Sequence, residues 1–238
     1  MLRRTQPAAT STHQGVGAQI RSIGAVFGRR ELRPLLLLLL LVTLIMALFV
    51  TTIGLFLQLR VGAPVAEAGL PPTIFGILNI VFQLALLPRL VRRYGERALI
   101  PVGFVALALA NLGLFFASSL LTTTALAVFL ALGITLLRPS LTALITRVTP
   151  PGEVGRVLGV TTSLDSLAEI IAPLLGGALI EVFNPAAPGL LAAAIAAVAL
   201  LLFGNVRQRI PARATAAVPE GAGACAARVA QIAFRAML

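Results

Sequence analysis

A chain of 238 residues that is 58% hydrophobic and only 11% charged is too apolar for a soluble domain, in which about a quarter of the residues are charged. The net charge of +11 comes from basic residues dispersed over the chain, with no tryptophan and only one tyrosine, Tyr94, which argues against nucleic acid as a partner. One histidine, His13, and one cysteine, Cys225, cannot form a metal cluster, a disulfide or a Cys/His nucleophile. We therefore expect an all-α membrane protein without cofactor or metal.

In chain order, the sequence predicts a tail, six membrane spans and a second tail. A bilayer core of ~30 Å requires ~20 apolar residues per helix, and the chain has six such stretches, of which the third and fourth fold back at 118–124. The predicted spans are 35–59, 71–90, 98–118, 122–146, 157–180 and 187–206. Residues 1–34 form a basic cytoplasmic segment in which 19–33 has the spacing of an amphipathic helix. Residues 207–238 have the composition of a disordered tail, and 229–238 suits the membrane surface.

The basic residues predict the orientation of the spans. All but two of the 19 fall in the tails or in loops on one side of the predicted membrane. The exceptions are Arg60, on the opposite side, and Arg138, inside a span. Because positive loops are retained in the cytoplasm, we expect a multi-pass protein of the cell (inner) membrane with both termini cytoplasmic.

Polar side chains within the spans are few and therefore informative, since an unpaired polar group is expensive in lipid. Asn79 and Gln83, four residues apart, share one face of the second span. They either hydrogen-bond a neighbouring helix or line a substrate path. Thr51 and Gln58 in the first span are weaker cavity-lining candidates, because threonine can also bond its own helix backbone.

Three ionisable residues, Arg138, Asp165 and Glu169, are predicted to lie inside the membrane, where charges are costly and usually paired or functional. Arg138 lies nine residues before Arg147 of a loop, and Asp165 lies nine residues after Arg156 of the same loop. At 1.5 Å per residue, both are about 13 Å from the cytoplasmic edge. We expect Arg138 to pair with Asp165, either as a structural ion pair or in coupling to protons or substrate. Glu169, one turn deeper and without an obvious cation, is the better candidate for a protonatable group.

The stretch 136–177, LLRPSLTALITRVTPPGEVGRVLGVTTSLDSLAEIIAPLLGG, resembles the tenth and eleventh helices of major facilitator superfamily transporters of the drug:proton antiporter type. That group commonly has a proline in the tenth helix, a P-x-x-x-x-G-R turn and a G-P-L-L-G-G break in the eleventh helix. The matching residues are Pro139, Pro150, Gly155, Arg156, Pro173, Gly176 and Gly177. Ala172 departs from the usual glycine.

The loop 88–97, PRLVRRYGER, resembles the C-terminal copy of the cytoplasmic motif of this family, G-x-L-x-D-R-x-G-R-R. The matching residues are Leu90, Arg93, Gly95 and Arg97. Pro88, Arg92 and Glu96 replace the glycine, the aspartate and an arginine. Without the aspartate, the usual gating charge cluster is not expected in the same form. The segment 28–41, GRRELRPLLLLLLL, resembles the end of the central cytoplasmic linker where it enters the seventh helix.

The resemblance covers residues 25–206 and implies the C-terminal six-helix half of a twelve-helix transporter, whose two halves rock against each other around a central cavity. It implies efflux of small hydrophobic or amphipathic solutes coupled to protons. The chain is then a fragment or truncated product, or it pairs with an N-terminal half or with a second copy. A non-transporting scaffold or an inert remnant is the alternative. A membrane-embedded enzyme would need a serine with a histidine, or paired aspartates, within the spans. His13 lies outside the spans and Asp165 is the only aspartate, which argues against an enzyme.

Overall fold

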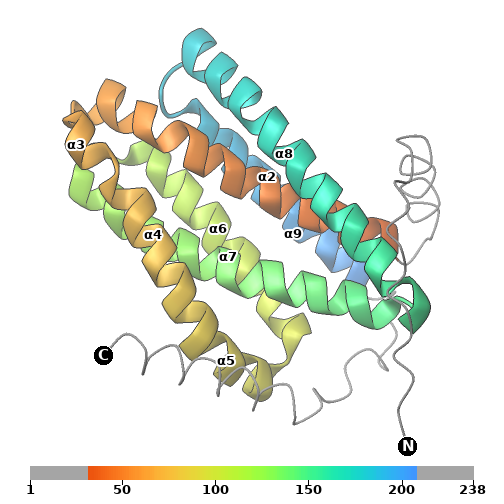
Figure 1. The fold of residues 1–238 in the computed structure, drawn as a ribbon. Helices are drawn as coiled ribbons and strands as arrows, with labels where there is room; N and C mark the ends of the chain where they lie inside the picture. The colour runs from red at the N-terminus through yellow and green to blue at the C-terminus, as the bar shows by residue number, and fades with distance from the viewer. Residues whose placement is uncertain (1–31, 208–238) are drawn as a thin grey trace, which may run out of the picture.

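The computed structural model describes residues 32–207, which form a helical bundle without strands (Figure 1). Most of the predicted amphipathic segment 19–33 and the predicted tail from residue 208 onward, including 229–238, lie outside the described residues. The longer elements are α2 (Leu32–Phe56), α4 (Leu70–Val81), α5 (Leu87–Tyr94), α6 (Glu96–Phe116), α7 (Leu120–Val148), α8 (Val154–Val182) and α9 (Ala187–Arg207). The short elements are a π-helical turn at Leu57–Val61, α3 (Val65–Ala68), a second π-helical turn at Phe82–Leu86, and a 3₁₀ turn at Pro151–Glu153.

Six helical segments of the described chain are long and apolar enough to cross a membrane. They are Leu32–Val61, Ala66–Tyr94, Glu96–Phe116, Leu120–Val148, Val154–Val182 and Ala187–Asn205. Each contains or nearly coincides with one predicted span, so the number and order of the spans are confirmed. Several extend beyond the apolar stretch because the helix continues through polar residues at the bilayer edge, where backbone groups can still reach water.

Local residues explain where several helices begin and end. Pro71 is in the first turn of α4, where its missing N–H costs no intrahelical bond. Ser119 caps α7, since its side chain accepts a hydrogen bond from the Thr122 amide at 3.2 Å. The turn between the third and fourth spans is therefore confined to 117–119 and does not extend to 124 as predicted. Gly95 ends α5 at φ +76°, a conformation that favours glycine.

Glycines allow close packing between α6 and α7. A Cβ atom on Gly133 would lie 2.8 Å from the Leu107 side chain and 3.0 Å from the Gly103 carbonyl oxygen, and a Cβ on Gly103 would lie 2.6 Å from Leu137. Small residues at such positions let helix backbones approach closely in a membrane. These glycines therefore fix the α6–α7 pair that supports the rest of the bundle.

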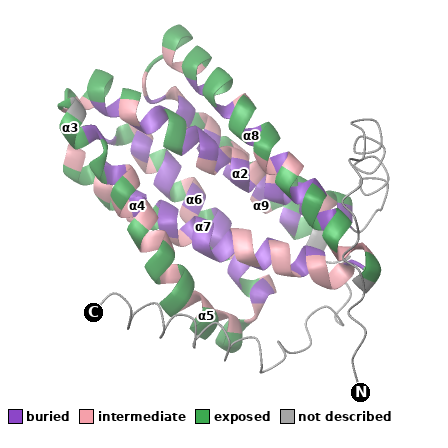
Figure 2. Cartoon of the chain, viewed as in Figure 1, coloured by how far each residue is buried: buried purple, intermediate pink, exposed green. Residues whose placement is uncertain are grey.

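Burial is uneven among the spans (Figure 2). The most apolar stretch of the α2 span is 61% buried, whereas that of α8 is 22% buried and that of the α4–α5 span only 6%. α4 packs mainly on α7, and α8 packs mainly on α2. The two most exposed spans thus flank the α2–α7 pair and leave their remaining surfaces without a protein neighbour in the described chain.

Candidate transport site

Arg138 and Asp165 form an ion pair between α7 and α8. Arg138 Nη2 lies 2.6 Å from Asp165 Oδ2. Thr43 of α2 donates a hydrogen bond of 2.8 Å to the other carboxylate oxygen, Oδ1, and Arg138 Nη1 lies 3.9 Å from the sulfur of Met46. The predicted pairing is confirmed, and the pair also contacts α2 through two residues that sequence reasoning did not single out.

The ion pair is open on one side. The side chains of Arg138 and Asp165 are 39% and 23% exposed, whereas Thr43 is buried. Both Asp165 oxygens accept a hydrogen bond, but a guanidinium has five N–H donors, and among the described residues only Nη2 of Arg138 reaches an oxygen. Within the described residues, most of the donors of Arg138 are therefore not used in bonds to oxygen.

Glu169 is the second carboxylate of α8 within the membrane. It lies four residues after Asp165, which places it on the same side of the helix about 6 Å along the axis. Its side chain is exposed, and no described residue forms an ion pair with it.

The two polar residues of the second span separate into different environments. Asn79 is half-buried and donates a hydrogen bond from Nδ2 to Thr135 Oγ1 of α7 at 3.2 Å, so the helix-bridging alternative applies to this residue. Gln83 is exposed. It remains a candidate for lining a substrate path.

A π-helical turn at Phe82–Leu86 contains Gln83 and joins α4 to α5. Pro88 follows the turn, and a proline cannot donate to the carbonyl four residues earlier and collides with it in a regular α-helix. The wider turn removes this conflict at Leu84, which is four residues before Pro88. Such turns occur often at functional sites, and this one contains the candidate residue Gln83.

Thr51 and Thr52 of the first span use their hydroxyl hydrogens within their own helix and cannot donate them to a ligand. Thr51 donates its hydroxyl hydrogen to its own helix, at 2.7 Å from the Ala47 carbonyl oxygen. Thr52 does the same at Leu48 and packs against Gly176 of α8. Gln58 is exposed in the π-helical turn that ends the span.

The expected helix breaks are not present. α7 continues through Pro139 from Leu120 to Val148, and α8 continues through Pro173, Gly176 and Gly177 from Val154 to Val182. A membrane helix tolerates an internal proline because only one hydrogen bond is lost and neighbouring helices support the segment. The function of Gly176 is instead close packing, since a Cβ atom there would collide with Thr52, while Gly177 faces open space.

A second ion pair joins the loop 88–97 to the end of α7. Arg147 Nη2 lies 3.0 Å from Glu96 Oε1. Glu96 begins α6 and is 9% exposed, and its buried Oε2 atom has no hydrogen-bond partner in the part of the chain that the structure describes. From the sequence, Glu96 was noted only as a departure from the family motif. The structure makes it the residue that ties the start of α6 to the end of α7.

The remaining loop candidates lie around this pair. Leu90 and Arg97 are half-buried, and Arg93 is exposed with its guanidinium carbon 5.4 Å from the centre of the Tyr94 ring. Gly155 and Arg156 are exposed in the first turn of α8. Within the described part of the chain, neither Gly155 nor Arg156 hydrogen-bonds to Arg138 or Asp165, so these two residues lie apart from that ion pair.

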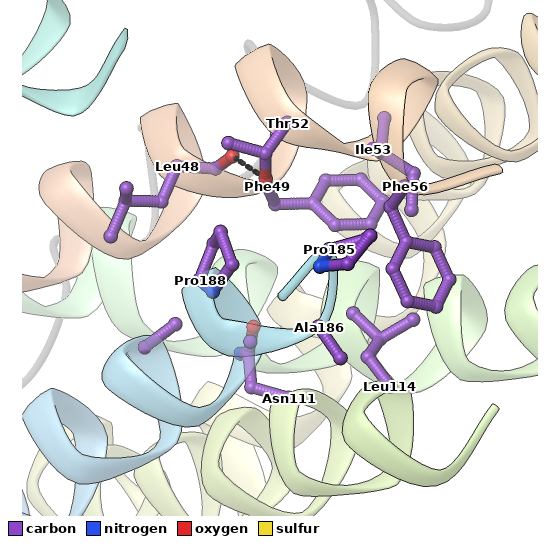
Figure 3. Close-up of a pocket in the computed structure, with 12 residues that line it drawn as sticks. Leu48, Phe49, Thr52, Ile53, Phe56, Asn111, Leu114, Pro185, Ala186 and Pro188 are labelled. Carbon is purple, nitrogen blue, oxygen red and sulfur yellow. Dashed lines mark hydrogen bonds between the residues drawn. The ribbon is translucent and has the colours of Figure 1, made fainter. Parts of the chain in front are cut away.

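A small hollow of about 20 Å³ lies between α2, α6 and the start of α9 (Figure 3). Its walls include Phe49, Phe56 and Asn111, a buried residue whose Nδ2 donates to the Leu107 carbonyl at 2.8 Å. A volume of this size holds about one water molecule. None of the residues singled out from sequence as transport candidates lines it, so it is distinct from the face that carries the charged residues.

Comparison with known proteins decides the family. The profile of the Major Facilitator Superfamily matches residues 3–236. The chain belongs to the Major Facilitator Superfamily. This membership agrees with the resemblance drawn from the motifs.

Curated relatives are similar over part of their length. "Multidrug resistance protein 2" of Bacillus subtilis (strain 168) is 28% identical over 157 residues, which are 64% of this chain and 39% of that protein. "Solute carrier family 22 member 18" of Mus musculus is 29% identical over 114 residues, 48% of this chain and 28% of that protein. The chain thus matches less than half the length of each relative.

Solved structures show the same fold. A peptide transporter POT in complex with sulfate superposes with a TM-score of 0.71 at 17% identity, covering 92% of this chain and 49% of that chain. The POT family transporter PepTSo gives a TM-score of 0.67 at 14% identity, covering 76% and 38%. The described bundle therefore has the fold of part of a transporter of this superfamily.

Proposed function

We propose that the chain takes part in proton-coupled efflux of small hydrophobic or amphipathic solutes, along a path over the face that carries Arg138, Asp165 and Glu169. The observation that carries the proposal is the half-open ion pair, with an unpaired carboxylate one helical turn away. A charge near the bilayer centre costs ~2.5 to 3.5 kcal/mol on insertion scales. Exposure to lipid would retain this cost, whereas a water-filled path or a second protein surface would reduce it.

A second six-helix bundle would complete the path. The α4–α5 span and α8 are the least buried of the six, and their exposed residues include Gln83 and Glu169. Polar side chains on a lipid-facing surface are unfavourable, so these helices are better suited to face another bundle. Alternating access in this superfamily requires one bundle to move against another. The partner is an N-terminal six-helix half or a second copy of this bundle.

Glu169 is proposed as the proton carrier. A carboxylate that binds and releases protons must be reachable and must not be held ionised by a fixed cation. Glu169 meets both conditions in the described chain, whereas Asp165 accepts bonds from both Thr43 and Arg138. The efflux direction and the solute class rest on the motif resemblance and on the name of the Bacillus subtilis relative.

The test is efflux of a lipophilic dye driven by a pH gradient, in vesicles that contain the chain together with a matching N-terminal half. Glu169→Gln should reduce the proton-driven flux about 100-fold or more, from the lower end of the range for a positioned proton-transfer group upward. Glu181→Gln is the matched control, because Glu181 is also an exposed glutamate of α8 but lies near its end. Equal flux for the two variants would reject Glu169 as the carrier, and no flux with any partner would favour a non-transporting scaffold.

A further inference from the structure

The helix α5 separates its charged and apolar residues onto different sides. Arg89, Arg92 and Arg93 recur at intervals of three and four residues, which places them on one helix face, and all three are exposed. Leu90 and Val91, between them in sequence, are half-buried. α5 is thus a short amphipathic helix whose outer face carries three positive charges.

Within residues 32–207, no carboxylate forms an ion pair with this arginine face. Glu96 is the one acidic residue of the loop 88–97, and it points inward to Arg147 of α7. Arg89, Arg92 and Arg93 have no ion pair with any described residue. Arg92 also stands where the resembled motif commonly has an aspartate, so the departure converts a mixed-charge face into a wholly positive one.

The arginine face lies where a membrane has its headgroups. α5 continues the α4–α5 span and ends at Gly95, so its last two turns are at the end of a membrane-crossing segment (Figure 1). Tyr94, 55% exposed beside Arg93, is of the residue type that is enriched at the membrane–water interface. Guanidinium groups bind phosphate with paired hydrogen bonds. Position and charge are therefore complementary to anionic headgroups.

We infer that the face formed by Arg89, Arg92 and Arg93 binds the headgroup phosphates of anionic phospholipids. This goes beyond retention of positive loops, which depends on the number of basic residues in a loop and not on their placement on one helix face. The inference does not depend on the proposed efflux activity. It requires only that the bundle be inserted in a membrane.

The test is lipid binding to the purified full chain in detergent. Short-chain phosphatidylglycerol or phosphatidylcholine is titrated, and bound lipid is counted by native mass spectrometry. Each arginine near a charged membrane surface contributes about fivefold, so Arg92→Gln with Arg93→Gln should weaken phosphatidylglycerol binding about 30-fold and leave phosphatidylcholine binding unchanged. Arg33→Gln with Arg156→Gln is the matched control, since it removes the same charge from two other exposed arginines at helix starts.

Three results would overturn the inference: equal binding of the two lipids, equal loss in the test and control pairs, or displacement of phosphatidylglycerol by an equal concentration of inorganic phosphate, which would indicate a free-anion site. Arg92→Lys with Arg93→Lys keeps the charge and should retain phosphatidylglycerol binding within about fivefold, the contribution of one basic residue. If the glutamine pair fails to fold by circular dichroism, Arg89→Gln alone should still cost about fivefold, and its failure to do so would count against the site.

Discussion

Arg138 and Asp165, 27 residues apart, meet at 2.6 Å across two neighbouring helices, with Thr43 of a third helix bonded to the same carboxylate. Removing one partner leaves the other charge without compensation, which costs 3–5 kcal/mol in a fully buried pair. Because this pair is partly exposed, we expect Arg138→Leu or Asp165→Leu to reduce stability by about 1 to 3 kcal/mol. The double variant should lose less than the sum of the single variants.

The measurement is unfolding in detergent followed by circular dichroism, because the chain lacks tryptophan. Thr43→Val provides a graded control, since it removes one neutral hydrogen bond and should cost only about 1 kcal/mol. Strict additivity of Arg138→Leu and Asp165→Leu would mean that the two side chains are not energetically coupled.

The close approach of α6 and α7 predicts a strong dependence on glycine at position 133. Gly133→Ala would place a Cβ atom 3.0 Å from the Gly103 carbonyl oxygen, and backbone cannot move aside cheaply. We expect destabilisation of about 1 to 3 kcal/mol. Gly177→Ala is the control. Its new Cβ atom would have no atom of a neighbouring helix within 4 Å, so this variant should be neutral or stabilised by up to about 1 kcal/mol through helix propensity. Comparable losses for both variants would contradict the packing argument.

The Glu96–Arg147 pair predicts an asymmetric response to substitution. The Glu96 side chain is 10% exposed and that of Arg147 is 26% exposed. Loss of the partner therefore costs more free energy for the carboxylate, because water can solvate it less. Arg147→Met should therefore destabilise the bundle more than Glu96→Gln, by about 1 kcal/mol or more. Thermal unfolding of the two variants in the same detergent measures this difference. A larger loss of stability for Glu96→Gln than for Arg147→Met would contradict this prediction.

Sequence reasoning succeeded where one-dimensional spacing determines the outcome. Six apolar stretches gave six spanning helices, and equal distances from Arg147 and Arg156 placed Arg138 and Asp165 at the same depth. Both results depend only on helix rise and on the length of the bilayer core.

Other features depend on contacts that spacing does not encode. Thr43 is one polar residue in a leucine-rich helix, and its bond to Asp165 joins positions 122 residues apart. The π-helical turn at 82–86 and the continuity of α8 through Pro173 reflect how a helix accommodates proline, which sequence alone leaves open. Glu96 was visible only as a mismatch to a motif until its partner on α7 was known.

The arginine distribution predicts that residue 152 and residue 118 face opposite sides of the membrane, with 152 in the cytoplasm. Gly152 and Ser118 are both exposed in connections between helices, so a cysteine at either position is accessible to a labelling reagent. Gly152→Cys and Ser118→Cys, each in a Cys225→Ser background, should react with a membrane-impermeant maleimide from opposite sides. Labelling of both from one side would refute the orientation.

The six-helix bundle by itself is expected to insert and fold but to transport nothing measurable. Its helices supply their own packing, through the α6–α7 contact at Gly103 and Gly133 and the α2–α8 contact at Gly176, so insertion needs no partner. A cavity that opens to each side in turn does need one, because a single bundle has no second surface to move against.

The measurement compares dye flux in vesicles containing only this chain with flux after co-expression of a matching N-terminal half. Helical content should be the same in both preparations, and flux should appear only in the second. Flux from this chain alone would contradict the prediction, and cross-linking between copies through a cysteine at exposed Gln83 would then identify a homodimer as the transporting unit.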